Sequence, residues 1–102
     1  MELRIVSHLY NQVTIDANAR AYTQGEDVAI LCELSNRTEN LVTSAMVTAV
    51  GYDHEGWIVA MAEAGPYYLF PGQIRPVRLV LHPEREGVHA VRLFPLATLS
   101  CQ

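Results

Sequence analysis

The chain has 102 residues, half of them hydrophobic, and a formal net charge of -4 with seven arginines and no lysine. This length is enough for one core, and we expect a single domain over residues 1–102. The arginines are scattered from Arg4 to Arg92 and form no basic stripe, which argues against nucleic acid as a partner. No apolar stretch approaches the roughly 20 residues that cross a bilayer, which argues against membrane insertion.

The N-terminus and the cysteines bear on localisation. Met1 and the residues after it lack the layout of a signal peptide. Two localisations stay open: cytoplasmic if the chain is complete, and extracytoplasmic if it is a domain excised from a longer protein. Cys32 and Cys101 match neither a metal-binding CxxC pair nor a disulfide-rich framework. We expect free thiols, with Cys32 a small buried residue, and a disulfide between the two as the alternative.

Period-2 alternation, broken by Gly, Pro, Asn or Asp, predicts an all-β sandwich or barrel. The expected strands lie near residues 3–6, 12–17, 28–35, 43–52, 57–63, 74–81 and 88–94, with a short one at 96–100. Within residues 74–81, Val77, Leu79 and Leu81 share one face, and Pro76 predicts an edge strand or a late start because it lacks a ladder N–H.

Residues 28–35 fit two structures. Val28, Ile30, Cys32 and Leu34 fall on one face of a strand, which predicts a half-buried strand. Asp27 followed by apolar residues at helical spacing also fits a capped helix of about three turns. The neighbouring Gly25 and Asn36 and the β-rich surroundings favour the strand.

The strand expected at 43–52 is apolar on both faces. Met46, Val50 and Tyr52 are large enough to fill a core, so we expect the opposite face to point outward; that face consists of Ala45, Val47, Ala49 and Gly51. Either the N-terminal strands or a second copy would then cover these small residues. We expect a homodimer formed through this face by two-fold symmetry.

Two turns follow from composition. Asp53 ends a strand, where its side chain can accept backbone N–H bonds, and Gly56 supplies the positive φ of a short hairpin loop. Pro71 and Gly72 have the composition of a type II turn.

These segments together resemble the FxLYD-type domain: Asn36-Arg37-Thr38, the run Ala45 to Val50, Tyr52-Asp53 with Gly56, Val59, and Leu69-Phe70-Pro71-Gly72 before a new strand. The resemblance covers about residues 28–94. It implies an antiparallel two-sheet immunoglobulin-like sandwich of about seven strands, with adhesion, assembly or ligand-presenting roles and no catalytic centre. The chain departs from the family pattern at Gly51, where a large apolar residue is usual, and at Val77, where Phe is expected.

The polar candidates favour ordinary loops over chemistry. Asp53-His54-Glu55 are consecutive residues of a turn, so their side chains splay apart and do not converge on a metal. His82 and His89 flank a loop and are in reach of each other if that loop closes a hairpin, but two histidines leave zinc short of ligands. No nucleophile elbow or phosphate loop occurs, so we expect no enzyme and no cofactor. Asn36-Arg37-Thr38 fits both a glycosylation acceptor and a β-turn.

The aromatic segment 65–72 is the best candidate for a binding surface. Trp57, Tyr67, Tyr68 and Phe70 are the expected binding residues, because aromatic side chains bury large area with few rotors to freeze. Two alternatives stay open: Leu69 and Phe70 plug one end of the sandwich, and Trp57 lies in the core, where truncation to Ala would cost roughly 3 to 5 kcal/mol. We expect a non-enzymatic interaction or assembly module with a protein partner or itself as partner. The alternative is a small-ligand-binding or accessory domain with a pocket near Trp57, Tyr67 and Tyr68.

Overall fold

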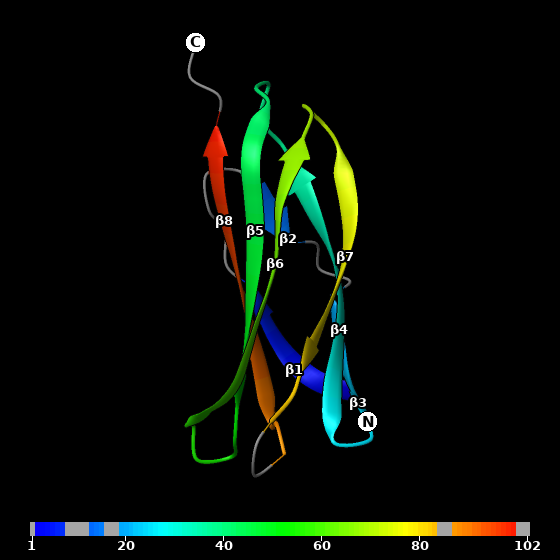
Figure 1. Cartoon of the computed structure of the whole chain (residues 1–102), viewed down its shortest axis with the longest axis vertical. Coiled ribbons are helices and arrows are strands. Elements are labelled where there is room, and N and C mark those ends of the chain that lie inside the picture. The colour runs from blue at the N-terminus through cyan, green and yellow to red at the C-terminus, as the bar shows by residue number, and fades with distance from the viewer. Residues whose placement is uncertain (1, 8–12, 16–18, 84–86, 100–102) are drawn as a thin grey trace.

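The computed structural model describes residues 2–7, 13–15, 19–83 and 87–99. All regular structure in these residues is β (Figure 1). The strands are β1 (Glu2–Ser7), β2 (Val13–Ile15), β3 (Arg20–Gln24), β4 (Asp27–Asn36), β5 (Val42–Tyr52), β6 (Ile58–Leu69), β7 (Ile74–Leu81) and β8 (Ala90–Leu99). No helix in the described part of the chain is long and apolar enough to cross a membrane.

The strands form two stacked sheets in a molecule 46 Å long. Sheet A contains β2, β3, β4 and β7, with β4 between β7 on one side and β2 and β3 on the other. Sheet B contains β6, β5 and β8, with β5 in the middle. The start of β1 pairs antiparallel with β3 and its remainder pairs parallel with β8, so β1 joins the sheets along one side. The expected all-β, two-sheet antiparallel sandwich is confirmed.

The count and the order of the strands refine that expectation. There are eight strands and not about seven, because two separate strands, β2 and β3, pair with β4 on its side away from β7. Counting that edge as one strand, sheet A has the chain order first, second, third, sixth, and sheet B has first, seventh, fourth, fifth. Immunoglobulin constant domains place strands A, B, E and D in one sheet and C, F and G in the other.

Most strand positions were predictable. β4, β5 and β7 match their expected ranges closely, and the helical alternative for 27–35 is wrong, since β4 pairs along its whole length with β7 or β3. β3 was not expected, β6 extends six residues beyond its expected end to Leu69, and the two C-terminal strands are one, β8. The ends of the strand expected at 12–17 lie outside the described residues.

Sheet A faces the core as its alternation predicts. Val28, Ile30, Cys32 and Leu34 are buried on β4, opposite Val77, Leu79 and Leu81 on β7. Among the described residues β7 pairs with β4 alone, so the edge position that Pro76 indicated is confirmed. Hydrophobic burial of this kind stabilises the fold by about 25 cal/mol per Å² of apolar surface.

Sheet B faces the core with the face opposite to the expected one. Ala45, Val47 and Ala49 have no solvent exposure, and Gly51 is buried with them. A Cβ built on Gly51 would lie 3.0 Å from a methyl group of Val88 and 3.1 Å from one of Leu81. The small side chains point inward because Leu81 of sheet A and Val88 already fill the core in front of Gly51. The homodimer expected through this face is therefore wrong, since the face is buried within one chain.

Both predicted turns are present. The Asp53 carboxylate accepts hydrogen bonds from the backbone N–H of Glu55 (2.9 Å) and of Trp57 (3.0 Å), and Gly56 has φ +89°. At the other end, the Gln73 N–H donates to the Phe70 carbonyl at 2.9 Å and Gly72 has φ +77°, as a type II turn requires. Asp53 is thus occupied in holding a turn.

Candidate functional site

The outer faces of the two sheets differ in chemistry. In sheet A the outward positions mix charged or polar groups with apolar ones, of which Leu31 and Ile74 are 42% and 54% exposed. Two polar pairs lie on this side: His82 Nδ1 lies 3.0 Å from Asp27 Oδ1, and Arg78 donates to Gln24 at 3.4 Å. In sheet B the outward positions form an apolar face. This apolar face consists of Met46, Val50, Tyr52, Ile58, Met61, Phe94 and Leu96.

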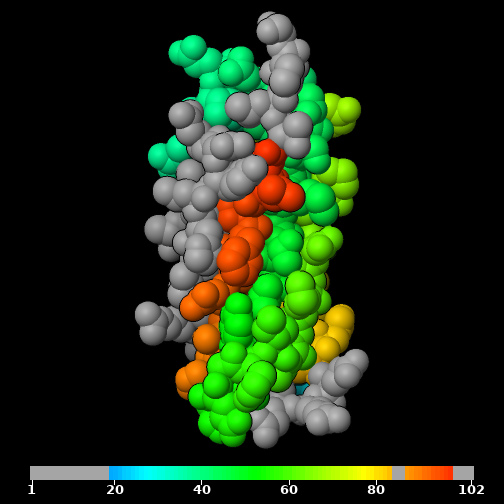
Figure 2. Space-filling view, turned by 90° about the vertical axis from the view of Figure 1, so that its left-hand side faces the viewer, coloured from blue at the N-terminus to red at the C-terminus, as the bar shows by residue number. Residues whose placement is uncertain are grey.

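The apolar face is built in rows across three strands. Tyr52 on β5 is in register with Ile58 on β6 and Ala90 on β8. Val50 is in register with Met61 and Arg92, and the next row contains Thr48, Glu63 and Phe94. Figure 2 shows this face, with β5 flanked by β8 and β6 and open to solvent between them.

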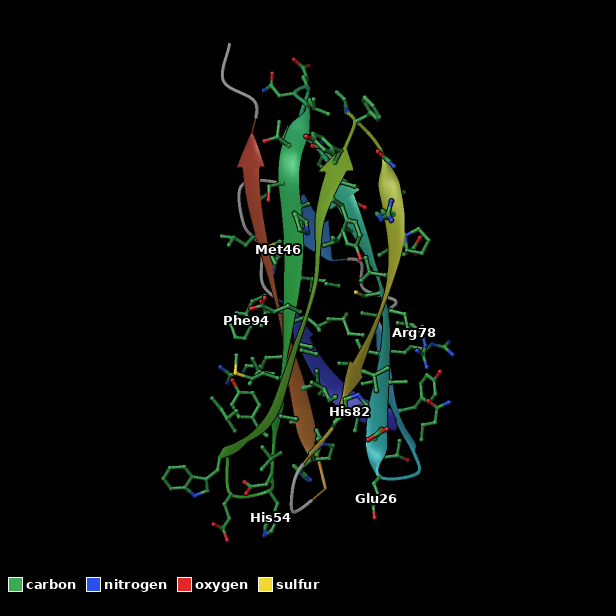
Figure 3. All side chains as sticks on the ribbon, in the orientation of Figure 1. Glu26, Met46, His54, Arg78, His82 and Phe94 are labelled. Carbon is green, nitrogen blue, oxygen red and sulfur yellow. The ribbon has the colours of Figure 1, made fainter. Side chains whose placement is uncertain are left out.

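Three of its large side chains are exposed, whereas Met46, Tyr52 and Phe94 are half-buried and Val50 is only 5% exposed. Met61 is 60% exposed, Ile58 58% and Leu96 54%, although scattered single apolar residues are the usual pattern on soluble proteins. Figure 3 shows Phe94 on the side of the molecule opposite to Arg78, which marks the charged outer face of sheet A. The two charged groups of the apolar face, Arg92 and Glu63, lie on β8 and β6, the two strands that flank β5.

A hollow of about 560 Å³ adjoins one end of the apolar face. Arg92 contributes to its lining, and its guanidinium carbon lies 5.5 Å from the centroid of the Tyr52 ring. His54 and His89 also line it, the latter held by a backbone hydrogen bond to the Tyr52 carbonyl. Asp53 lines the hollow as well, with its carboxylate bonded to the N–H groups of the turn. The Arg92 guanidinium is the group of the lining that can bind an anionic or aromatic group.

The four expected binding residues are not brought together. Trp57 is 70% exposed directly before β6, so the alternative that placed it in the core is wrong. Tyr68 and Phe70, 66% and 65% exposed, lie at the far end of β6, about 35 Å or more away at the rise of an extended strand. A single pocket near Trp57, Tyr67 and Tyr68 is therefore excluded by distance.

Tyr67 and Leu69 belong to the sandwich. Arg75 on β7 stacks over the Tyr67 ring at 4.1 Å from its centroid, which links the two sheets at their open side. Leu69 is fully buried and closes that end of the core, whereas Phe70 does not. The alternative in which Leu69 and Phe70 close one end of the sandwich is therefore correct for Leu69 and wrong for Phe70.

The Asn36 side chain is buried and hydrogen-bonded within the fold. It is 1% exposed, and its side-chain nitrogen donates to the backbone carbonyls of Leu69 and Asn40, both at 2.9 Å. Its side-chain oxygen accepts from the N–H and the hydroxyl of Thr38. Of the two functions that fit this motif, the structure supports the turn, because the amide that would carry a glycan is buried and bonded.

The titratable groups do not converge on a metal. No group of three His, Cys, Asp or Glu residues gathers in a metal-binding arrangement within residues that the structure describes. His82 is bound to Asp27 beside sheet A while His89 lines the hollow in sheet B, so no hairpin of β7 and β8 brings the two histidines together. His82 follows β7, which pairs in sheet A, and His89 precedes β8, which pairs in sheet B.

Cys32 is buried with its thiol protonated. It is 5% exposed and free, and burial first, then the charge of Glu33, raises the pKa of its thiol from 9.0 to about 11. Cys101, its expected alternative partner, lies outside the described residues.

We expect the Cys32 thiol to resist alkylation in the folded protein near about pH 8, because the thiolate is the nucleophile. The free energy of unfolding should fall as pH rises from 9 to about 11, since the unfolded thiol ionises at its ordinary pKa while the folded thiol stays protonated. Mass spectrometry after iodoacetamide treatment of Cys101→Ser checks the first, and urea titrations against Cys32→Ala in that background check the second. Rapid native labelling at Cys32 would contradict the burial.

Comparison of the chain with protein-family models, with curated proteins and with solved structures found no match.

Proposed function

We propose that this chain is a non-enzymatic interaction or assembly module that binds a protein partner on the apolar face of sheet B. One observation carries the proposal: the outer face of sheet B exposes three large apolar side chains beyond half, Ile58, Met61 and Leu96, whereas that of sheet A exposes one, Ile74, among charged and polar groups. Exposed apolar surface of this kind, rimmed by polar groups, is typical of a protein-binding site.

The positions of the charged groups support a protein partner over a small substrate. Glu63 and Arg92 stand at the edges of the apolar face, which leaves its centre apolar, as the core of a protein interface is. Trp57 and the residues of the Asp53 turn add an exposed aromatic group at one corner. Tryptophan is enriched among residues that dominate binding energy.

The immunoglobulin-like, FxLYD-type relationship is part of the proposal. It is supported by the two stacked sheets, by the Asp53–Gly56 and Pro71–Gly72 turns, and by a first strand that leaves one sheet for the other. The strand order is the feature in which the chain differs from an immunoglobulin constant domain.

Site-specific photo-crosslinking tests the proposed function. A photo-reactive amino acid in place of Met61, in the cell that makes the protein, is expected to give a discrete cross-linked product. The matched control is the same amino acid in place of Arg78, an exposed residue on the outer face of sheet A. Equal products from both positions, or none from Met61, would reject the apolar face as a docking surface.

A second candidate function is binding of a small anion in the hollow beside Tyr52. The specific observation is the Arg92 guanidinium in a hollow of about 560 Å³ with His54 and His89. A panel of carboxylates and phosphates in a thermal-shift assay separates the candidates, because a specific ligand raises the melting temperature by mass action. A rise that disappears in Arg92→Gln would favour the ligand-binding module.

A further inference from the structure

We infer that the partner on the apolar face is a second copy of this chain, packed face to face about a two-fold axis that runs parallel to the strands. The inference rests on the proposed function and names its partner. Three features of the face carry it: its charges, its hollow and its size.

The charges select the axis. An axis along β5 places β8 of one copy over β6 of the other, so Arg92 lies one row from the partner's Glu63, within reach of a guanidinium. The same contact occurs twice, as two-fold symmetry requires. An axis across the strands would place β8 over β8 and β6 over β6. Among the described outward residues, β8 carries only the positive Arg92 and β6 only the negative Glu63, so neither strand would meet a charge of opposite sign.

The hollow fits the same axis. Trp57 directly precedes Ile58, which is in register with Tyr52 and Ala90. Turning the second copy about the strand direction keeps this row at one level and carries Trp57 to the side of the partner's hollow, beside its Arg92. An exposed indole thereby meets an arginine and a space, an arrangement that favours cation–π contact and burial.

The area of the apolar face limits the affinity of the dimer. Three strands about 4.8 Å apart and about ten residues long span roughly 450 Å² in projection per copy. Two corrugated faces then bury on the order of 1,000 Å² in total, at the weak end of specific interfaces. We therefore expect a dissociation constant in the micromolar range. The monomer should dominate at about 1 µM and the dimer at roughly a few hundred micromolar.

Sedimentation of the full chain from about 1 to about 500 µM tests the inference. The mass of the wild type should rise from 11.4 kDa toward twice that value. Met61→Glu should stay monomeric, whereas Leu31→Glu, which places the same charge on the outer face of sheet A, should associate like the wild type. Trp57→Ala should weaken association at least about fivefold with an unchanged circular dichroism spectrum.

Charge reversal tests the geometry. Arg92→Glu makes both charge contacts Glu against Glu, and Glu63→Arg makes both Arg against Arg, so each variant should associate about tenfold more weakly. Their mixture should form a heterodimer of near wild-type affinity, because both contacts are again opposite in sign. This recovery requires both variants to be folded, so it separates the interface from damage to the fold.

Each other outcome overturns the inference. A wild type that remains monomeric at about 500 µM, a Met61→Glu variant that still dimerises, or a mixture that stays monomeric would reject this dimer. The proposed function is decided separately by the Met61 cross-link: a product of larger mass than two chains keeps the docking surface and rejects the second copy as its occupant.

Discussion

Replacing Asn36 with alanine is expected to lower the free energy of unfolding by about 2 to 4 kcal/mol. The buried amide joins three segments: its nitrogen bonds the carbonyls of Leu69 and Asn40, and its oxygen bonds Thr38. Its own backbone N–H donates to the Gln73 carbonyl and its carbonyl accepts from the Gly72 N–H, which continues the pairing of β4 with β7 within sheet A. Removal of the side chain leaves a buried carbonyl at Leu69 without this donor, and an unmade buried hydrogen bond costs more than a made one contributes.

Urea titration measures the effect of Asn36→Ala, with two variants that separate its causes. Asn40→Ala, which keeps the backbone carbonyl that Asn36 uses and alters an exposed side chain, should change stability by less than about 0.5 kcal/mol. Asn36→Asp keeps the acceptor and loses both donations, so it should destabilise strongly near neutral pH and less toward about pH 4, where the carboxyl protonates. An Asp variant as stable as the wild type at neutral pH would contradict this network.

Gly65→Ala is expected to cost more than about 3 kcal/mol, because two effects add. Gly65 has φ +119°, which side-chain-bearing residues rarely adopt. A Cβ there would also lie 2.6 Å from the backbone oxygen of Ala45 and 3.2 Å from the Met46 Cα. The neighbouring strand β5 cannot move aside easily, because it lies between β6 and β8.

Gly25→Ala is the matched control for Gly65→Ala. Gly25 also has a positive φ, +67°, but nothing lies within 4 Å of a Cβ built on it. Its substitution should cost only the conformational preference, about 1 kcal/mol. Thermal and urea unfolding of both variants compare the two costs. Equal losses would mean that the close approach of β6 to Ala45 is not present in solution.

The sequence predicted the strands of sheet A better than the orientation of sheet B. On β4 and β7, apolar residues alternate with charged ones such as Glu33 and Arg78, so one face had to point inward. On β5 both faces are apolar. Alternation then identifies which residues share a face, such as Ala49 and Gly51, and cannot decide which face is buried. The size of the facing residues decides it, and that depends on which strands oppose each other.

The candidate site was predictable only in part for the same reason. Trp57 lies at the end of the turn that Asp53 holds, and this turn was predicted. Its exposure was not predictable, because no local pattern tells whether an aromatic residue at the end of a turn packs inward. The apolar face left a signal in the sequence: β5, β6 and β8 are apolar at outward positions such as Met61 and Leu96, as strands covered on both faces are.

The central claim is that the apolar face of sheet B is where this chain binds, and amide chemical shifts measured over a concentration series test it most directly. Between about 20 and about 500 µM, we expect the shifts that move to cluster on the outward residues of β5, β6 and β8, Ile58, Met61 and Phe94 among them. Those of β4 and β7 should stay in place. Shifts that cluster instead on the outer face of sheet A, around Leu31 and Arg78, would contradict the account.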